Sequence, residues 1–337
     1  MICVIRVYAL RPNNLIIAHP TTTFLLIRDN PPDPLNPCAR LIRTYPTKIH
    51  HHPLRKCYYP LSQQQTMMNR SEINVSVVQA TPNMGDIPAN LRTIESYAME
   101  EKTDLLVFPE MFLTGYLLED ELPRLAITMD GPEVKRLEKI ASQSGSHIIV
   151  GGPVQGDRFD YYNSSLLIGP DGYIGRYDKW HLVNFLPFDE KRYFFKGTKL
   201  PVFETELGTI GLIICYDIFF PELCTALTMQ GADIIVSISA SPTFSRKFFE
   251  IVAPARAVEN TVFFIFNNLN GTEERLTFWG GASIYNPRGF ELAKGEYFKD
   301  LAVRATLDRN DLLIARQGRT VIRDKRPLAF EILKDIL

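Results

Sequence analysis

Three residues with reactive side chains each follow an apolar stretch of the sequence. Cys215 follows GLII, Glu110 follows LLVFP, and Lys179 follows YIGRYD. An ordinary cysteine thiol is mostly protonated at neutral pH, so it attacks a carbonyl carbon well only when a neighbouring base takes its proton. A carboxylate can be that base, and a lysine can favour the thiolate and later stabilise an oxyanion. Together the three residues predict nucleophilic catalysis by cysteine.

Taken singly, each of these residues has an ordinary structural interpretation. A buried free cysteine packs as a small hydrophobe, and glutamates and lysines at strand ends are usually solvated. Catalysis by a Cys–His pair is the natural competitor, but beyond residue 70 the only histidines are His147 and His181. His147 begins a predicted strand and His181 adjoins Lys179, so we expect His181 to be structural or to face the substrate. Cys224 lies among apolar residues of a predicted helix, and we expect it to pack in the core.

The reactive residues must be brought together by the strands that precede them. From Ile73 onward the hydrophobic pattern alternates between strands and helices. Predicted strands cover residues 73–80, 104–110, 147–152, 209–217, 232–239 and 261–267, and predicted helices follow Asp86 and cover residues 131–145, 221–231 and 254–260. A hairpin is predicted over residues 161–179, with Pro170-Asp171-Gly172 as its turn. Because reactive groups collect at the carboxyl ends of strands in mixed sheets, this order predicts an α/β layer structure with a shared site.

The first seventy residues differ in composition from the remainder. They contain nine Lys/Arg but two Asp/Glu, nine of the 23 prolines and four of the six histidines. Transit peptides are also basic and poor in acidic residues, but they are rich in serine, and Ser62 is the only serine here. The histidine run 50–52 is more typical of solvated chain than of a metal site. We therefore expect residues 1–70 to be a leader that is disordered or absent from the mature protein, and dispensable or included through a mistaken start.

Composition argues against several classes of function. The formal net charge is -1, and residues 71–337 are acidic without a basic stripe, which argues against a nucleic-acid partner. No apolar run approaches the roughly 18–20 residues that cross a membrane. Five cysteines at irregular spacing fit neither a disulfide framework nor a zinc site, so we expect a reducing compartment, a cytoplasmic location and no metal. Gly151-Gly152 is too little for a nucleotide-binding loop, and we expect no cofactor.

Three sequence blocks occur in an order that resembles the nitrilase (carbon-nitrogen hydrolase) superfamily. They are FPEMFLTGY at 108–116, YDKWHL at 177–182 and CYDIFFPEL at 215–223. The likeness extends from about Ile73 to about residue 308, and it includes FDEKRYFFKG at 188–197, ARAVENTVFFIFNN at 255–268 and LTFWGGASIYNPRG at 276–289. The resemblance implies an α/β fold in which a four-layer α-β-β-α sandwich dimerises into an eight-layer particle.

The resemblance also implies roles for individual residues. Cys215 would be the nucleophile, Glu110 the general base and then the acid, and Lys179 the stabiliser of the tetrahedral intermediate. Glu190 would orient the substrate and the lysine, and the backbone N–H of Tyr216 would complete the oxyanion hole. The side chains expected to contact substrate are those of Tyr116, His181, Tyr216 and Phe219. The implied reaction is hydrolysis of a small amide through a cysteine thioester, with release of ammonia or an amine.

Two departures from the family pattern bear on the substrate. True nitrilases usually follow the cysteine with Trp-Glu, whereas this chain has Tyr216-Asp217, the pattern of amidases and carbamoyl-amide hydrolases. Some branches place an arginine for a substrate carboxylate where this chain has Phe219, which argues against an acidic substrate. Four alternatives stay open: a nitrilase, a carbamoyl-amide hydrolase, a glutaminase component that works with a separate synthetase, and a non-catalytic amide-binding scaffold.

The expected domain organisation follows from these blocks. Residues 71–310 would form the carbon-nitrogen hydrolase domain, and residues 311–337 a tail that docks on a dimer partner. The helix at 221–231 is the expected dimer helix, so we expect a homodimer or a higher homo-oligomer. The substrate pocket is expected to come from loops at 117–125 and 241–248, because loops on a rigid scaffold carry many binding residues.

Overall fold

The computed structural model describes residues 15–18, 24–27 and 71–336. The chain divides into two compact units, Met1–Tyr59 and Pro60–Leu337. In the first unit, strands β1 (Leu15–Ala18) and β2 (Phe24–Ile27) pair with antiparallel orientation. The rest of the predicted leader, including the histidine run 50–52, lies outside the described residues. The expectation that the leader is dispensable therefore stays a prediction.

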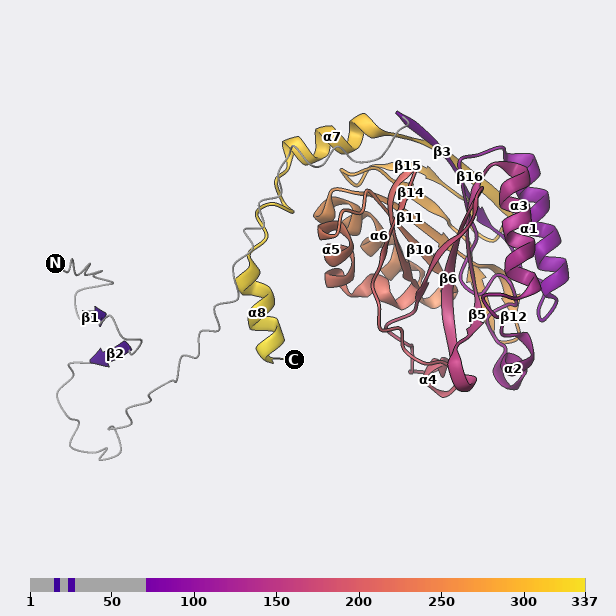
Figure 1. The fold of residues 1–337 in the computed structure, drawn as a ribbon, viewed down its shortest axis with the longest axis horizontal. Helices are drawn as coiled ribbons and strands as arrows, with labels where there is room; N and C mark the ends of the chain where they lie inside the picture. Colours follow the sequence, from indigo (N-terminus) through magenta and orange to yellow (C-terminus); the bar gives the residue numbers. More distant parts are fainter. Residues whose placement is uncertain (1–14, 19–23, 28–70, 337) are drawn as a thin grey trace. The chain divides into compact units, whose positions relative to one another are not determined.

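Two six-stranded sheets form the body of the second unit (Figure 1). The strands of the first sheet are, in spatial order, β16 (Leu301–Asp308), β3 (Glu72–Gln79), β4 (Leu105–Val107), β5 (His147–Gln155), β6 (Tyr161–Gly169) and β7 (Gly172–Asp178). Those of the second sheet are β15 (Glu291–Lys294), β14 (Ser283–Tyr285), β11 (Phe263–Asn268), β10 (Ile234–Ser239), β9 (Gly208–Ile214) and β8 (Val202–Thr205). Strands β12 (Asn270–Glu273) and β13 (Leu276–Trp279) form a separate hairpin. The central strands β3 to β5 and β9 to β11 run parallel, and their outer neighbours are antiparallel.

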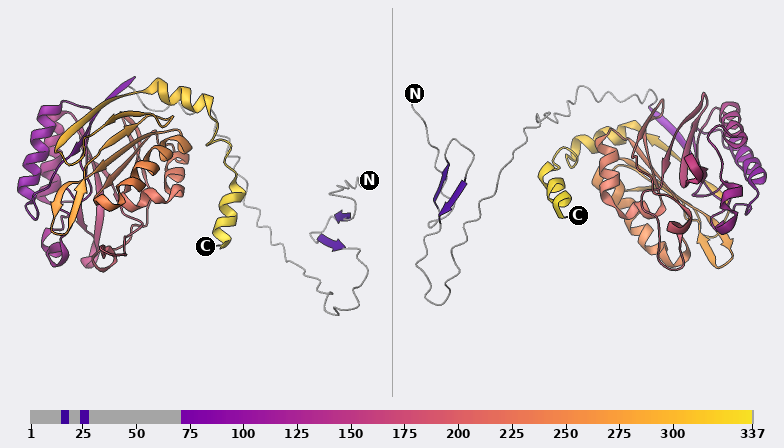
Figure 2. Two further views of the ribbon diagram at one scale, coloured as in Figure 1. Left: turned by 180° about the vertical axis from the view of Figure 1, so that it is seen from behind. Right: turned by 60° about the horizontal axis from the view of Figure 1, so that its bottom comes forward.

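Helices cover the outer face of each sheet (Figures 1 and 2). Helices α1 (Ile87–Glu101) and α3 (Pro132–Ser144) pack against the first sheet. Helices α5 (Pro221–Met229) and α6 (Arg246–Asn260) pack against the second sheet. The layers therefore follow the order α-β-β-α, which confirms the predicted sandwich.

The alternation of side chains along β3 shows how the sequence divides the core into layers. Val75 and Val77 belong to the hydrophobic cluster that includes the second sheet. Val78 instead belongs to the cluster that includes Ile94 of α1 and Leu137 of α3. Because successive residues of a strand point to opposite faces, a strand with apolar side chains on both faces must be covered on both sides. This double burial holds the two sheets face to face and fixes where their strand ends meet.

The start of α1 is confirmed, whereas the start of α6 differs from the prediction. The Asp86 side chain accepts a hydrogen bond from the backbone N–H of Ala89 at 2.9 Å, which caps α1. Helix α6 begins at Arg246 and contains Pro254, the residue at which the sequence predicted its start. Phe249, Ala253 and Ala257 are all buried, so the apolar face with its spacing of four residues continues across the proline. Residues 246–248 of the predicted pocket loop are therefore helical.

Short elements complete the fold. The remaining helices are α2 (Leu122–Leu125), α4 (Glu190–Tyr193), α7 (Arg309–Gly318) and α8 (Pro327–Ile336), with 3₁₀ helices at Glu119–Glu121, Asp157–Phe159, Cys215–Phe219 and Thr243–Ser245. Helix α7 spans the predicted domain boundary at residue 310, and its Leu312 and Ala315 are buried. Within the described residues, every helix falls short of the length and apolar character needed to cross a bilayer.

Candidate active site

Cys215 stands at the junction between strand β9 and a 3₁₀ helix. Strand β9 ends at Ile214, and Cys215 then has a φ of 49°, in the left-handed region that side chains other than glycine rarely occupy. The Asp217 carboxylate secures this turn: its Oδ2 accepts the Tyr177 hydroxyl at 2.8 Å and the backbone N–H of Ile214 at 3.2 Å. The cysteine is only 8% exposed. Its thiol is therefore held in one place at the end of the strand.

Glu110 lies three residues beyond the end of β4 in a second tight turn, and it is followed by Met111, which has a φ of 55°. The carboxylate is fully buried and accepts three hydrogen bonds. Its Oε1 accepts the side-chain amide of Asn163 at 2.7 Å and the Lys179 ammonium at 2.8 Å. Its Oε2 accepts the backbone N–H of Ala240, which follows β10 of the opposite sheet, at 2.6 Å. Glu110 is thus fixed by groups from both sheets.

Lys179 bridges two carboxylates. It follows β7 directly, and its Nζ donates to Glu110 Oε1 at 2.8 Å and to Glu190 Oε1 at 2.7 Å. Glu190, the first residue of α4, also accepts the Tyr116 hydroxyl at 2.7 Å and the backbone N–H of Val183 at 2.9 Å. Burial alone opposes a charged lysine, but the two carboxylates raise the pKa of Lys179 well above its ordinary value. The lysine is therefore a permanent cation in the site.

The electrostatics of the cluster favour an internal proton transfer. Burial, and then the negative charge of Glu110, raise the pKa of the Cys215 thiol well above its ordinary value, so the resting cysteine is protonated. Burial also raises the pKa of Glu110, although Lys179 opposes that shift. Moving the thiol proton to Glu110 leaves the net charge of the buried cluster unchanged, whereas losing it to water adds a buried negative charge. Glu110 is suited to accept the proton of Cys215.

A cavity of about 250 Å³ opens beside the Cys215 side chain. Its lining consists of Tyr116, Val183, Phe185, Phe188, Cys215, Tyr216, Phe219, Ser241, Pro242, Phe244, Ser245, Phe248 and Phe249. Three of the four expected substrate-contacting residues, Tyr116, Tyr216 and Phe219, are among them. The predicted loop at 241–248 also contributes, through both its 3₁₀ helix and the start of α6.

His181, the fourth expected substrate contact, lies outside this lining. Its backbone N–H donates to Asp217 Oδ1 at 2.9 Å, and its Nδ1 lies 2.8 Å from the same oxygen. Its ring stacks on Phe220 with 3.5 Å between the ring centroids. These contacts join the segment that carries Lys179 to the turn that carries Cys215. In the structure His181 is placed to hold these two segments in register.

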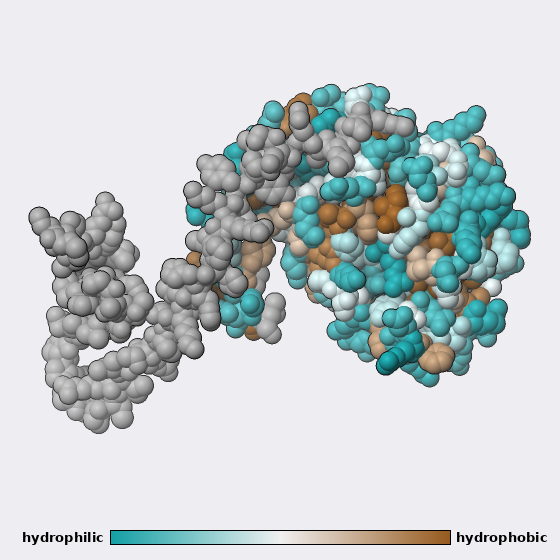
Figure 3. Space-filling view, viewed as in Figure 1, coloured by the Kyte–Doolittle hydropathy of each residue, from teal (hydrophilic) through white to brown (hydrophobic). Residues whose placement is uncertain are grey.

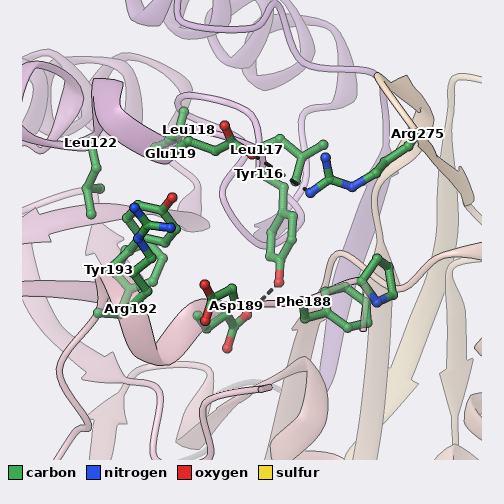
Figure 4. A pocket seen from close by; sticks show the side chains of 13 residues that line it. Tyr116, Leu117, Leu118, Glu119, Leu122, Phe188, Asp189, Arg192, Tyr193 and Arg275 are labelled. Carbon is green, nitrogen blue, oxygen red and sulfur yellow. Dashed lines mark hydrogen bonds and ion pairs between the residues drawn. The ribbon is translucent and has the colours of Figure 1, made fainter. Parts of the chain in front are cut away.

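A second cavity of about 250 Å³ lies beyond Tyr116 and Phe188, which line both cavities (Figure 4). It contains charged side chains that the first cavity lacks, among them Glu119, Asp189, Glu190, Arg192 and Arg275. Figure 4 shows the Tyr116 side chain beside this cavity, and a dashed line marks the hydrogen bond that its hydroxyl donates. The predicted loop at 117–125 contributes Leu117, Leu118, Glu119 and Leu122 to this second cavity. Cys215 is not part of its lining.

Sequence reasoning missed three positions that hold the site together. Asn163 donates to Glu110, Ala240 donates to the same carboxylate through its backbone, and Gly151 lies beneath it. A Cβ built on Gly151 meets the backbone N of Met111 at 2.4 Å and the Cα of Glu110 at 2.6 Å. The only sequence signals are a polar residue inside the strand YYNSSLLI and the pair Gly151-Gly152. Neither signal identifies a partner without the fold.

The chain resembles known proteins over the whole of this site. The family model described as carbon-nitrogen hydrolase matches residues 74–317. A probable nitrilase of Schizosaccharomyces pombe is 31% identical over 264 residues, which cover 75% of this chain and 96% of that protein. An (R)-stereoselective amidase of Pseudomonas sp. is 30% identical over 263 residues, which cover 75% of this chain and 92% of the amidase.

Solved structures agree with the sequence matches. A Saccharomyces cerevisiae protein described as a member of branch 10 of the nitrilase superfamily has a TM-score of 0.69 and 26% identity. That comparison covers 74% of this chain and 95% of the yeast protein. Because the family match spans every residue of the buried cluster around Cys215 and both sheets that hold it, the chain belongs to the carbon-nitrogen hydrolase family of the nitrilase superfamily.

Proposed function

We propose that this carbon-nitrogen hydrolase cleaves the C–N bond of a small amide through a thioester on Cys215. The observation that carries the proposal is the buried cluster of Glu110, Lys179 and Glu190 next to the cysteine. Burial of a lysine and two carboxylates costs solvation free energy, and a protein that only binds amides would not need these buried charges. The cluster supplies the base, the acid and the cation that acyl transfer requires.

Acylation begins with transfer of the thiol proton from Cys215 to Glu110. The Cys215 sulfur forms a bond to the amide carbon, and the electron pair of the C=O π bond moves to the oxygen. The Lys179 ammonium and the backbone N–H of Tyr216 stabilise that oxyanion. When the C=O bond forms again, the C–N bond breaks and Glu110 gives its proton to the leaving nitrogen. The products are a thioester on Cys215 and free ammonia or an amine.

Deacylation uses the same groups with water as the nucleophile. Glu110 takes a proton from the water as its oxygen bonds to the thioester carbon, and the electron pair again moves to the carbonyl oxygen. Collapse breaks the C–S bond, and the departing Cys215 sulfur recovers the proton from Glu110. The carboxylic acid leaves and the site returns to its starting protonation. Glu190 keeps the Lys179 ammonium oriented throughout, because its Oε1 accepts a hydrogen bond from Lys179 Nζ at 2.7 Å.

An amide is favoured over a nitrile by the residues that follow the nucleophile. Asp217 accepts hydrogen bonds from Tyr177, from the Ile214 backbone and from the His181 backbone, so its short side chain is fitted to the turn. Relatives named as an (R)-stereoselective amidase and as an N-carbamoylputrescine amidase of Arabidopsis thaliana support cleavage of an amide-type bond. The relative named a probable nitrilase is the reason to include nitriles in the test.

The proposal is tested by ammonia release together with the mass of the intact protein. Wild type is incubated with a panel of primary amides and nitriles, and rapidly acidified samples are examined for the added mass of an acyl group. We expect ammonia from amides and an acyl adduct on Cys215, both absent in Cys215→Ala. Cys224→Ala is the matched control, because Cys224 is buried on α5 and burial raises its pKa to about 12. An adduct elsewhere, or ammonia release that persists in Cys215→Ala, would refute the proposal.

A further inference from the structure

Resting on the proposed function, we infer that the acyl half of the substrate is an uncharged hydrocarbon group, either a medium-length chain or a ring. The cavity that contains Cys215 is the place where the acyl group must lie, because the thioester carbon is bonded to that sulfur. Every residue of its lining is uncharged, and eight of the 13 are aromatic. These residues form the wall of the cavity, and their apolar character indicates the chemical class of the acyl group.

The polar side chains of the wall are largely engaged within the protein. The Ser241 and Ser245 hydroxyls lie 2.7 Å apart, and Ser245 Oγ also donates to the Pro242 carbonyl at 2.8 Å. The Tyr116 hydroxyl donates to Glu190. Tyr216 presents its ring, which packs against Phe185 at 5.7 Å between centroids. A charged end group on the acyl chain would therefore lose its water without gaining an ionic partner in this wall.

Phe219 contributes an apolar ring to the wall of the cavity that contains Cys215. Its ring packs edge-on against Phe249 with 5.0 Å between centroids, and Phe249 packs in turn on Phe266 at 5.4 Å. This chain of rings continues the hydrophobic core into the cavity. The apolar surface of the wall is therefore continuous with the hydrophobic core.

The size of the cavity sets the length of the acyl group. A protein cavity of about 150 Å³ holds benzene, so about 250 Å³ accommodates a six-carbon group with room to spare. At the mouth, Phe185, Phe244 and Phe248 are 51%, 58% and 59% exposed, so apolar surface continues outward. Figure 3 shows hydrophobic surface gathered in patches on the folded unit, between hydrophilic regions. Each methylene that enters the cavity is expected to raise kcat/KM about fourfold.

The charged second cavity is not an alternative binding site for the acyl group. Arg192 and Arg275 line that cavity, but Tyr116 and Phe188 stand between it and the nucleophile. Their rings contact each other edge-on at 6.1 Å between centroids. An acyl carbon bonded to Cys215 lies on the apolar side of this partition.

The inference is tested by kcat/KM for acetamide, butyramide and hexanamide, and for the monoamides of glutaric and adipic acid. We expect a rise of about fourfold per methylene up to hexanamide. The carboxylate-ended amide of matched length is expected to be about 100-fold poorer. Phe248→Arg should lower kcat/KM for hexanamide about tenfold and improve the carboxylate-ended amides. Ile251→Arg is the control, since Ile251 has the same 59% exposure on the same helix but lies outside the cavity lining.

Better turnover of the carboxylate-ended amides by wild type would overturn the inference while leaving amide hydrolysis intact. If Arg192→Ala then abolished that preference, the acyl group would belong in the second cavity. A kcat/KM that does not change with the length of the acyl chain would also overturn the inference.

A second assay separates failure of the inference from failure of the proposed function. Aldehydes add to a thiol without any turnover: the sulfur bonds to the carbonyl carbon, the C=O π bond breaks, and the thiol proton goes to the oxygen. Butanal and succinate semialdehyde have the same number of carbons and differ in the terminal carboxylate. We expect butanal to protect Cys215 from iodoacetamide at about 100-fold lower concentration. That result without hydrolysis of any amide would uphold the apolar site and refute the amidase, whereas equal protection would refute the inference.

Discussion

In the proposed mechanism the single carboxylate of Glu110 both accepts and donates a proton, and its hydrogen bonds are compatible with both steps. Oε1 is occupied by Asn163 and Lys179, and Oε2 receives the Ala240 backbone. The lysine and amide favour the ionised form, whereas burial favours the protonated form. A carboxyl group balanced in this way can accept the thiol proton and give it to the leaving nitrogen in the same catalytic cycle.

Replacement of Glu110 by glutamine keeps the shape of the side chain and removes the base. We expect Glu110→Gln to lower kcat for amide hydrolysis by about 10²–10⁴-fold, the range that general acid–base catalysis contributes. Ammonia release under saturating amide is the measurement. Glu222→Gln is the matched control, because Glu222 is an exposed glutamate in the first turn of the helix that follows the nucleophile. A kcat for Glu110→Gln equal to that of the control would exclude Glu110 as the base.

Asn163 offers a test of how Glu110 is tuned. Asn163→Asp places a second carboxylate within hydrogen-bonding distance of Glu110 Oε1, where the amide donates at 2.7 Å. A neighbouring negative charge raises the pKa of a carboxyl group, and Glu110 must be deprotonated to act as a base. The acidic limb of kcat/KM is therefore expected to move to higher pH, by about one unit or more. Asn163→Ser, which adds no charge, should lower kcat/KM without that displacement of the pH profile.

At the scale of elements, strand β5 supports the turn that carries Glu110. The Gly151 N–H donates to the Pro109 carbonyl at 3.1 Å, and the Gly151 carbonyl accepts from Leu113 at 3.1 Å. Hydrogen bonds of this kind on both sides bring the two backbones into contact, which leaves no room for a side chain at residue 151. The position of Glu110 therefore depends on a glycine in a neighbouring strand.

Gly151→Ala is expected to displace the Glu110 turn. The added Cβ would lie 2.7 Å from the Pro109 carbonyl oxygen, closer than van der Waals contact allows. Overpacking of this kind costs about 1–3 kcal/mol in the free energy of unfolding, and a shift of the base lowers kcat by about 10²-fold. Urea denaturation and ammonia release measure the two effects. Gly318→Ala, with no atom within 4 Å of the added Cβ, should change neither.

The strands and the reactive residues could be predicted from the sequence, because each depends on local pattern. Lys179 and Cys215 follow β7 and β9 directly, as their apolar runs predict. Helix α6 was predicted eight residues too short, since a proline usually marks a helix start and Pro254 here lies within an apolar face that Phe249 begins. Prediction from local pattern fails where a single residue, such as a proline, indicates a helix boundary and the longer apolar periodicity continues across it.

Contacts between distant segments could not be predicted from the sequence. Asn163 is 53 residues from Glu110 and reaches it from β6 of the same sheet. Ala240 is 130 residues from Glu110, and the two meet only because the two sheets pack face to face. The place of His181 against Asp217 and Phe220 likewise depends on the register between two chain segments. These side chains have no periodic signal, so their roles become visible only in the folded molecule.

At the scale of the whole molecule, the C-terminal tail joins the second-sheet side of the sandwich and leaves apolar side chains uncovered. Helix α7 is anchored by buried Leu312 and by Arg316, whose guanidinium lies 2.8 Å from Asp233. Further along, the Lys325 ammonium donates to Thr225 on α5 at 3.0 Å. The segment between α7 and α8 therefore contacts the helix that the family resemblance implies for dimerisation.

Helix α8 carries the last prediction, because its Leu328, Ile332 and Ile336 are 63%, 50% and 75% exposed. Exposed apolar side chains gathered on one helix indicate an interaction surface, and a two-fold axis would bring the same surface of a second copy against it. We propose a homodimer in which α5 and the tail contribute to the interface.

Light scattering at micromolar concentration should give twice the mass of one chain, and Leu328→Asp combined with Ile332→Asp should give a single chain. Phe159→Asp, a change at a 78% exposed residue outside the tail, should leave the dimer intact. A single-chain mass for the unaltered protein would refute the dimer, and a dimer that survives the double substitution would place the interface elsewhere.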